Sequence, residues 1–275
     1  MRAMPIALLA LTACGGPNEE TLVDELRVLA MVAEPPEVAP GAAAAVDVVV
    51  ADPEESGVDV LFWTCASLGE GCLEHAAPGL GATVAAPTDG HVRVTRTAPV
   101  ELAGIVGDGV TVLPIPMYAL ACAPGVCPLI DVAATSPAPG TADADTLAAF
   151  LEDPFTGMES LALTGTSLGF SLLSVSTRVE PVVNPLIALR GDPPTTIAVE
   201  GELSLVFDTG STDDLNAWGY GTAGGFTMPS YAPEDDGSVT LKWIAPVEPG
   251  LVRLWVVVVG EAGGSAVWEG QVTVE

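Results

Sequence analysis

Positive charge is scarce in this chain. Its 275 residues contain 8 Lys and Arg against 36 Asp and Glu, which gives a formal net charge of -28. A surface of this sign repels nucleic acid and anionic lipid headgroups, so the composition excludes a nucleic-acid-binding role. Charged residues reach only 16% whereas 49% are hydrophobic, and this balance excludes intrinsic disorder across most of the chain.

The apolar run at the start of the chain is too short to cross a membrane. It extends from Ala3 to Leu11, whereas a helix that spans a bilayer needs ~20 apolar residues. Arg2 precedes the run, and the small residues Thr12 and Ala13 follow it. This order of charge, apolar stretch and small residues is typical of a secretory signal peptide.

The sequence Leu-Thr-Ala-Cys at residues 11–14 resembles the lipobox of bacterial envelope lipoproteins. The resemblance implies cleavage before Cys14 and attachment of a diacylglyceryl group and an acyl chain, such as palmitate, to it. Two or more acyl chains anchor a protein durably, since each buried CH2 contributes ~0.8 kcal/mol. We therefore expect a signal peptide over residues 1–13 and a flexible tether over residues 14–20. An aspartate directly after the lipidated cysteine favours the inner membrane in this family, so Gly15 implies the outer membrane.

Four further cysteines are available to the fold: Cys65, Cys72, Cys122 and Cys127. An even number in an oxidising compartment predicts two structural disulfides. Both intervals are short and turn-like, which favours Cys65–Cys72 and Cys122–Cys127, with a crossed pairing of the two loops as the alternative. Zinc is the competing interpretation, because four thiolates can bind it tetrahedrally. The intervals are looser than Cys-x2-Cys, and this favours disulfides.

Residues 29–63 and 186–218 share a pattern that we interpret as an internal repeat. Each has a strand, a Pro-Pro turn, a second strand, an acidic turn and a strand that carries a tryptophan, Trp63 or Trp218. This order resembles the start of an immunoglobulin-like sandwich, in which the tryptophan is the core residue of the third strand. Residues 184–275 also resemble the bacterial Ig-like and PKD-like modules of surface proteins.

The predicted fold is all-β, with two tandem immunoglobulin-like β-sandwiches over residues 21–183 and 184–275. The 30 Gly and 24 Pro suit many turns between short strands. The first domain exceeds the ~100 residues of a simple sandwich, so we expect insertions in it. One insertion contains a short helix that begins near Thr141 and is closed by Pro154.

Two motifs resemble catalytic ones. Gly165-Thr-Ser167-Leu-Gly169 has the spacing of a hydrolase nucleophile elbow, but a strand-like segment follows it, and both histidines precede it. Asp208-Thr-Gly-Ser resembles the aspartic protease motif, whose chemistry needs two aspartates that share a proton. No second Asp-Thr-Gly occurs, so Asp208 would have to meet its copy in a homodimer.

Acidic turns and tryptophans are the remaining candidate binding features. Carboxylates on the turns can ligate calcium, and the weak candidates are Asp213, Asp214, Asp235 and Asp236. We expect most tryptophans to lie in the sandwich cores, with a carbohydrate-stacking face as the alternative. These tryptophans are Trp63, Trp218, Trp243, Trp255 and Trp268.

The sequence thus predicts a non-catalytic protein of the cell envelope, without a cofactor, that is anchored to the outer membrane by lipid on Cys14. An envelope protein or a glycan is the expected partner. The alternative is an envelope hydrolase, a homodimeric aspartic protease that uses Asp208.

Overall fold

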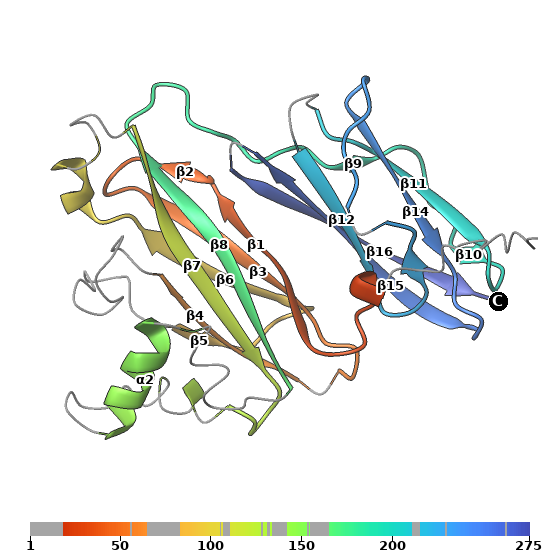
Figure 1. Ribbon diagram of the computed structural model, residues 1–275, viewed down its shortest axis with the longest axis horizontal. Coiled ribbons are helices and arrows are strands. Elements are labelled where there is room, and N and C mark those ends of the chain that lie inside the picture. The colour runs from red at the N-terminus through yellow and green to blue at the C-terminus, as the bar shows by residue number, and fades with distance from the viewer. Residues whose placement is uncertain are drawn as a thin grey trace, which may run out of the picture.

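Figure 1 shows the computed structural model of the chain. It describes residues 19–55, 57–64, 83–104, 106, 111–127, 129–130, 133, 142–152, 154, 165–210, 215–228, 230–261 and 263–275. The strands build two β-sandwiches that follow one another along the chain. This confirms the all-β fold of two tandem immunoglobulin-like sandwiches, the first of which is enlarged by insertions and a short helix.

The first sandwich consists of a three-stranded and a five-stranded sheet. The three-stranded sheet has the order β1 (Arg27–Glu34), β3 (Ala43–Ala51) and β6 (His91–Thr97). The five-stranded sheet has the order β2 (Glu37–Val38), β8 (Thr166–Ser176), β7 (Val112–Cys122), β4 (Asp59–Thr64) and β5 (Thr83–Ala85).

The second sandwich pairs two four-stranded sheets. One has the order β13 (Gly225–Phe226), β14 (Ser238–Ile244), β11 (Glu202–Asp208) and β9 (Ala188–Leu189). The other has the order β10 (Thr196–Ile197), β16 (Ser265–Val274), β15 (Gly250–Gly260) and β12 (Leu215–Gly221).

The strand order repeats between the two sandwiches. The order β1-β3-β6 corresponds to β9-β11-β14, and β2-β8-β7-β4 corresponds to β10-β16-β15-β12. In both, a two-residue strand pairs in parallel with the last strand, β2 with β8 and β10 with β16. The internal repeat expected from the sequence is therefore confirmed at the level of topology.

Each sandwich has its own apolar core, built by side chains that alternate along the strands. In the first core the sheets meet at residues such as Val46, Val48, Phe62, Ile115 and Leu173. In the second they meet at residues such as Leu205, Phe207, Leu241, Trp243 and Val256.

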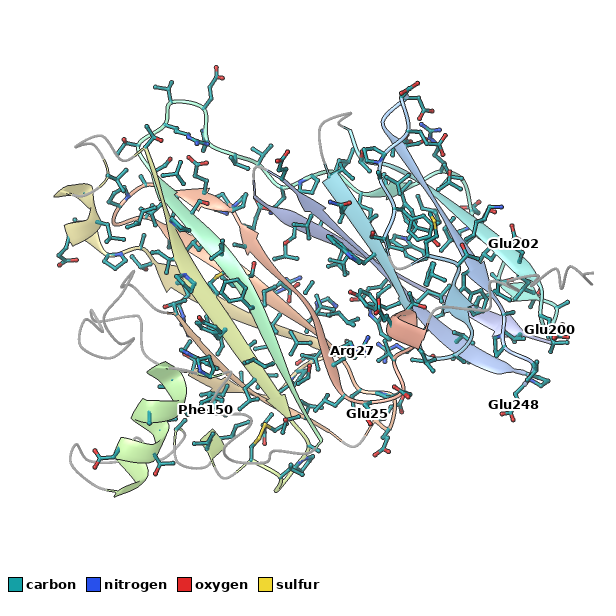
Figure 2. All side chains as sticks on the ribbon, viewed as in Figure 1. Glu25, Arg27, Phe150, Glu200, Glu202 and Glu248 are labelled. Atoms are coloured by element: carbon teal, nitrogen blue, oxygen red, sulfur yellow. A yellow bond between two sulfur atoms is a disulfide. The ribbon has the colours of Figure 1, made fainter. Side chains whose placement is uncertain are left out.

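The expectation for Trp63 was wrong. Its neighbour Phe62 lies in the sandwich core, and Trp63 faces the other side of the five-stranded sheet. There it is covered by helix α2 (Ala142–Glu152), whose Phe150 ring lies 5.7 Å from the indole and points toward the sheet (Figure 2). Successive residues of a strand face opposite sides, so only one of the two rings can enter the core.

Trp218 departs from the expectation in the same way. Its neighbour Ala217 lies in the second core, whereas Trp218 is half-buried on the outer side of the sheet. Trp243 is fully buried in that core, and Trp268 packs against it with its ring 5.2 Å from Phe207.

A third apolar cluster joins the two sandwiches. The sheets succeed one another as layers across Figure 1, with β1-β3-β6 next to β12-β15-β16. Between them Trp255 of β15 is buried with Val49 and Ala51 of β3 and with Val23, and Tyr220 packs against this cluster. Trp255 is therefore an interface residue and not the sandwich-core residue that we expected.

The segment before β1 belongs to this interface as well. Glu19–Thr21 forms the short helix η1, so Glu19 and Glu20 of the expected tether are in a helix. The Phe226 N–H donates to Thr21 Oγ1 at 3.0 Å, and the Val23 N–H donates to the Gly221 carbonyl at 2.9 Å. Within the described ranges, no helix combines the length and the apolarity that a membrane crossing requires.

Candidate functional site

Ser167, the serine of the Gly-x-Ser-x-Gly motif, lies within strand β8. Its hydroxyl accepts a hydrogen bond at 2.9 Å from the backbone N–H of Val28 in β1. Strand β8 continues without interruption to Ser176, whereas a nucleophile elbow needs a sharp turn into a helix. Ser167 thus joins the two sheets of the first sandwich at their edge.

Asp208, the aspartate of the protease-like motif, ends strand β11 and pairs with a cation. Its Oδ1 lies 2.6 Å from an Arg190 guanidinium nitrogen, and the same guanidinium contacts Asp236 at 3.1 Å. Hydrogen bonds from Ser238 and Arg190 lower the pKa of Asp236, and the two carboxylates raise the pKa of Arg190. In an aspartic protease two aspartates face each other and share a proton. Here a guanidinium contacts both carboxylates, so the arrangement is a different one.

The candidate calcium ligands are not gathered around a common point in the part of the chain that the structure describes. Asp236 is held by Ser238 and Arg190, and Asp235 lies exposed in the same turn. No group of three potential ligands occurs among the described residues. Asp213 and Asp214 lie outside these residues.

Two of the five cysteines form a disulfide, and the other three lie outside the residues that the structure describes. Cys122 and Cys127 form a disulfide across the turn that follows β7, as predicted. This bond lies in the apolar cluster under α2. Cys14, Cys65 and Cys72 lie outside the described residues, so lipidation and the second disulfide stay predictions.

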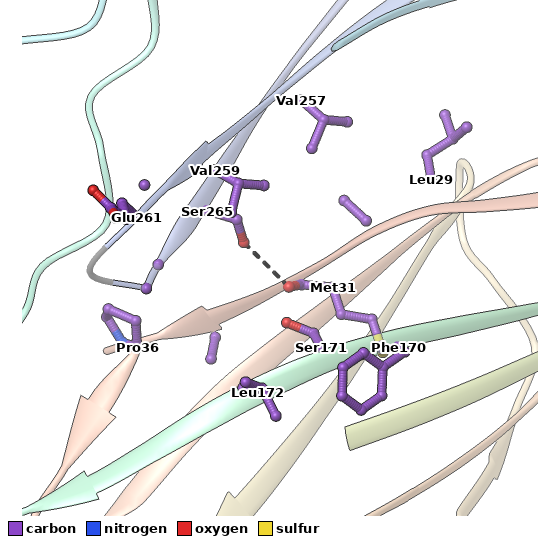
Figure 3. Close-up of a pocket in the computed structure, with 15 residues that line it drawn as sticks. Leu29, Met31, Pro36, Phe170, Ser171, Leu172, Val257, Val259, Glu261 and Ser265 are labelled. Atoms are coloured by element: carbon purple, nitrogen blue, oxygen red, sulfur yellow. Dashed lines mark hydrogen bonds between the residues drawn. The ribbon is translucent and has the colours of Figure 1, made fainter. Parts of the chain in front are cut away.

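The most distinctive site is a groove between the two sandwiches, which we call the interdomain groove (Figure 3). It has a volume of about 370 Å³, and apolar side chains from three strands line most of it. These include Leu29 and Met31 of β1, Phe170 and Leu172 of β8, and Val257 and Val259 of β15.

Large apolar side chains remain exposed along this groove. Phe170 is 52% exposed, Leu172 46% and Val259 37%. A second hollow on the other side of the β15–β16 turn adds Val183 and Leu186, which are also exposed. Both belong to residues 177–187 between β8 and β9, which we call the linker. Contiguous exposed apolar surface on a soluble domain is typical of an interaction site, whereas single exposed apolar residues are ordinary.

Polar contacts of the linker fix the walls of the groove relative to each other. The Asn184 side-chain amide donates to the Ala33 carbonyl of β1 at 2.8 Å, and its oxygen accepts from the Ser265 N–H of β16 at 3.0 Å. The Ser265 hydroxyl donates to the Met31 carbonyl at 3.2 Å. One linker residue therefore ties both sandwiches together at the rim.

The linker itself is held by a buried carboxylate. Glu37 of β2 accepts hydrogen bonds from the Ser176 hydroxyl and from the Val182 N–H, and its second oxygen lies 3.5 Å from Arg178. A buried carboxylate is costly unless it is paired and hydrogen-bonded, and here both conditions are met. The groove is thus bounded by a firmly attached segment.

A histidine bridges the sandwiches on the opposite side of Trp255. The His91 Nδ1 lies 3.1 Å from Asp47 of the first sandwich, and its Nε2 lies 2.7 Å from Glu269 of the second. Each ring nitrogen of His91 therefore contacts a carboxylate of a different sandwich. Together with the Trp255 cluster, this bridge fixes the angle at which the groove opens.

The charge around the interdomain groove is negative. Glu261 lines the groove, Glu34 at its rim accepts from Asn184, and Glu180 lines the adjoining hollow. Arg178 lies on the same linker, but it faces Glu37. An occupant therefore meets apolar walls and an acidic rim.

This groove is not apparent from the sequence, because its walls come from strands far apart in the chain. One signal was present in the form of uninterrupted apolar runs at residues 48–51 and 254–258. A strand with one solvated face alternates, whereas a continuous apolar run indicates burial on both faces. These two runs form the facing strands β3 and β15 of the interface.

Comparisons with known proteins give only remote structural matches. No family model and no curated protein matches the chain.

Among solved structures, an I-band fragment of titin matches with 9% identity and a TM-score of 0.26, covering 91% of this chain and 63% of that one. The adhesin InvE of Yersinia pseudotuberculosis matches with 13% identity and a TM-score of 0.24, over 90% of this chain and 58% of that one. An alpha-2-macroglobulin of Escherichia coli matches with 11% identity and a TM-score of 0.26, over 94% of this chain and 18% of that one. The chain thus spans less than two thirds of each, and matches with such low TM-scores carry no argument.

Proposed function

We propose that this chain is a non-catalytic, lipid-anchored protein of the bacterial cell envelope that binds a partner through the interdomain groove. The observation that carries the binding role is the groove itself, with Phe170, Leu172 and Val259 exposed on a tightly joined pair of sandwiches. Keeping such side chains in water is unfavourable by ~25 cal/mol per Å², and a partner that covers them recovers this free energy.

The anchoring part of the proposal depends on Cys14. We expect the native protein in the outer-membrane fraction, with a mass that includes the diacylglyceryl group and the acyl chain. Cys14→Ala should move the protein to the soluble periplasmic fraction as an uncleaved precursor. Unchanged fractionation of this variant would refute lipidation.

The binding part is tested by site-specific photo-crosslinking in cells. A photo-reactive amino acid in place of Phe170 should give a discrete cross-linked species. The same amino acid in place of Leu251, which is 64% exposed on the same molecule but away from the groove, should not. Equal cross-linking from both positions, or none from either, would contradict a binding role for the groove.

Asp208→Asn separates this proposal from an aspartic protease. The variant should keep both the envelope location and the cross-link from position 170, because Asp208 contacts Arg190 and lies outside the groove. A proteolytic activity that this substitution abolished would overturn the non-catalytic assignment.

A further inference from the structure

We propose that the occupant of the interdomain groove is an extended polypeptide segment with basic flanks, which adds to the open edge of β8 as an extra strand. This inference rests on the proposed binding function and specifies the chemistry of its partner. Strand addition of this kind supplies affinity through main-chain hydrogen bonds and specificity through pockets for alternate side chains.

The backbone of β8 presents hydrogen-bonding groups to the groove. The Ser174 N–H donates to the Pro36 carbonyl at 3.0 Å and so points away from β7. Because the direction alternates along a strand, the N–H and C=O groups of Phe170 and Leu172 point the same way. Strand β2 pairs with β8 only at Ser174 and Val175, and no hydrogen bond to the backbone of Phe170 or Leu172 from the groove side occurs among the described residues.

Prolines on the neighbouring strand agree with this geometry. Leu172 stands opposite Pro116 of β7, and Ser174 stands opposite Pro114. Proline has no N–H, so these pairs cannot exchange the two ladder bonds, and the groups of Leu172 and Ser174 must point outward. The pairing of β4 with β7 ends at Thr64, so the same two prolines lie on a part of β7 that β4 does not cover. Because proline has no N–H, this uncovered edge of β7 offers no hydrogen-bond donor at either position.

The open stretch of β8 lacks the usual protection of a sheet edge. Natural edges are short, covered, charged or interrupted by proline. In this protein β2, β9, β10 and β13 have two residues each, and β6 carries His91, Arg93 and Arg96. Residues 170–173 read Phe-Ser-Leu-Leu, with neither charge nor proline. An unprotected edge beside exposed apolar side chains is a template for one more strand.

The opposite wall of the groove is already satisfied. The outward carbonyls of Met31 and Ala33 in β1 accept hydrogen bonds from Ser265 and Asn184. An added strand therefore finds its hydrogen-bonding partners on β8, while β1 contributes the apolar side chains of Leu29 and Met31.

The ends of the open edge limit how much of a partner can pair. At one end β1 packs over Gly169, where a Cβ would collide with Val28, and the Val28 N–H donates to Ser167 Oγ; at the other end β2 pairs with β8 from Ser174 onward. The distance between Gly169 and Ser174 along an extended strand is roughly 17 Å. Only residues 170–173 lie between them, so the paired part of the occupant is about four residues long at 3.4 Å per residue.

Charge selects the flanks of the occupant. At the Ser174 end of the open stretch, the flanking residues of the occupant emerge near Glu34, Glu180 and Glu261, on a protein with a net charge of -28. Lys or Arg at these positions is attracted, and Asp or Glu is repelled. The groove offers few hydroxyl or amide groups to a glycan, since its lining is mostly apolar. The observations therefore favour a polypeptide.

The test uses the peptide acetyl-Lys-Val-Thr-Val-Thr-Val-Lys-amide as the probe and isothermal titration calorimetry with the full mature chain. We expect saturable binding, which weakens by about tenfold when both Lys are replaced by Glu. Two further probes carry backbone N-methyl groups on every second residue. One probe is methylated at the odd-numbered positions of the peptide and the other at the even-numbered positions. Methylation of one set of positions should abolish binding, because it removes the N–H groups that face β8, and methylation of the other set should be tolerated. Equal binding of the two methylated probes would overturn strand addition.

Variants of the chain provide the matching controls. Leu172→Pro removes one outward N–H without removing a bond to β7, and it should weaken binding by about tenfold. Leu172→Ala keeps the N–H and should weaken binding by only about threefold. Glu261→Gln should reduce the preference for the Lys-flanked probe, whereas Glu248→Gln, at the far end of the second sandwich in Figure 2, should leave it unchanged. Equal binding by the two Leu172 variants would contradict the proposal.

The outcomes separate this inference from the proposed function. A cross-link from position 170 together with no binding of any probe would overturn strand addition and leave the groove as a binding site for another class of partner. Loss of that cross-link together with no probe binding would overturn both.

Discussion

Trp255→Ala tests whether the two sandwiches form one mechanical unit. The indole is 2% exposed in the cluster between β3 and β15, and the Arg253 guanidinium lies 5.2 Å from its ring. A buried tryptophan removes about 200 Å² from water, which at ~25 cal/mol per Å² corresponds to about 5 kcal/mol. Measured Trp→Ala costs in cores are ~3–5 kcal/mol, so we expect a loss of about 4 kcal/mol in the free energy of unfolding.

The cost should take the form of lost coupling between the sandwiches. Trp255 belongs to neither sandwich core, so both cores stay intact in the variant. Differential scanning calorimetry should give one transition for the native chain. For Trp255→Ala it should give two, the first lower by roughly 10 °C, since 1 kcal/mol corresponds to ~2–4 °C in a protein of this size.

Leu251→Ala is the matched control. It lies on the same strand but is 64% exposed, so its effect should stay within about 0.5 kcal/mol. A change of less than about 1 kcal/mol for Trp255→Ala, with a single transition retained, would refute the interpretation of this cluster as the joint between the sandwiches.

Three further predictions concern single contacts. His91→Ala removes the bridge to Glu269 and should lower the free energy of unfolding by about 1 kcal/mol, because the contact is partly exposed. Urea titrations measure this loss, and a variant as stable as the native chain would contradict it. Replacing both Cys122 and Cys127 by Ala should cost about 2 kcal/mol for so short a loop, and an unchanged urea midpoint would contradict a stabilising role. The lowered pKa of Asp236 adds stability above the ordinary carboxyl range, which is lost as the pH falls through the native pKa. Asp236→Asn should therefore flatten the stability curve below about pH 4, and an identical acid limb would contradict it.

Much of the first sandwich was predictable, because its elements depend on local sequence. Pro154 and the small and apolar residues before it predicted a helix, and α2 spans Ala142–Glu152. The short turn between Cys122 and Cys127 predicted their disulfide. The repeat of Pro-Pro and acidic turns predicted two similar sandwiches, because turn residues fix where strands begin and end.

The face on which each tryptophan lies was not predictable in the same way. Trp63 and its neighbour Phe62 are both apolar, and a shift of one residue in register exchanges their sides. The pairing of β4 with β7 and the cover provided by α2 decide that Trp63 leaves the core. The ion pairs of Asp208 were not predictable from the sequence either. Arg190 is distant in sequence from Asp236, and only the fold brings these two residues together with Asp208.

The fold class, the repeat and the negative charge follow directly from the amino-acid sequence, because composition, turn residues and strand patterns act over short stretches of chain. Only the tertiary structure decided that the sandwiches pack sheet against sheet and leave an apolar groove beside an open edge of β8. These features arise where β1, β8 and β15 meet, and contacts between distant segments are set by the packing of whole sheets and not by any local pattern.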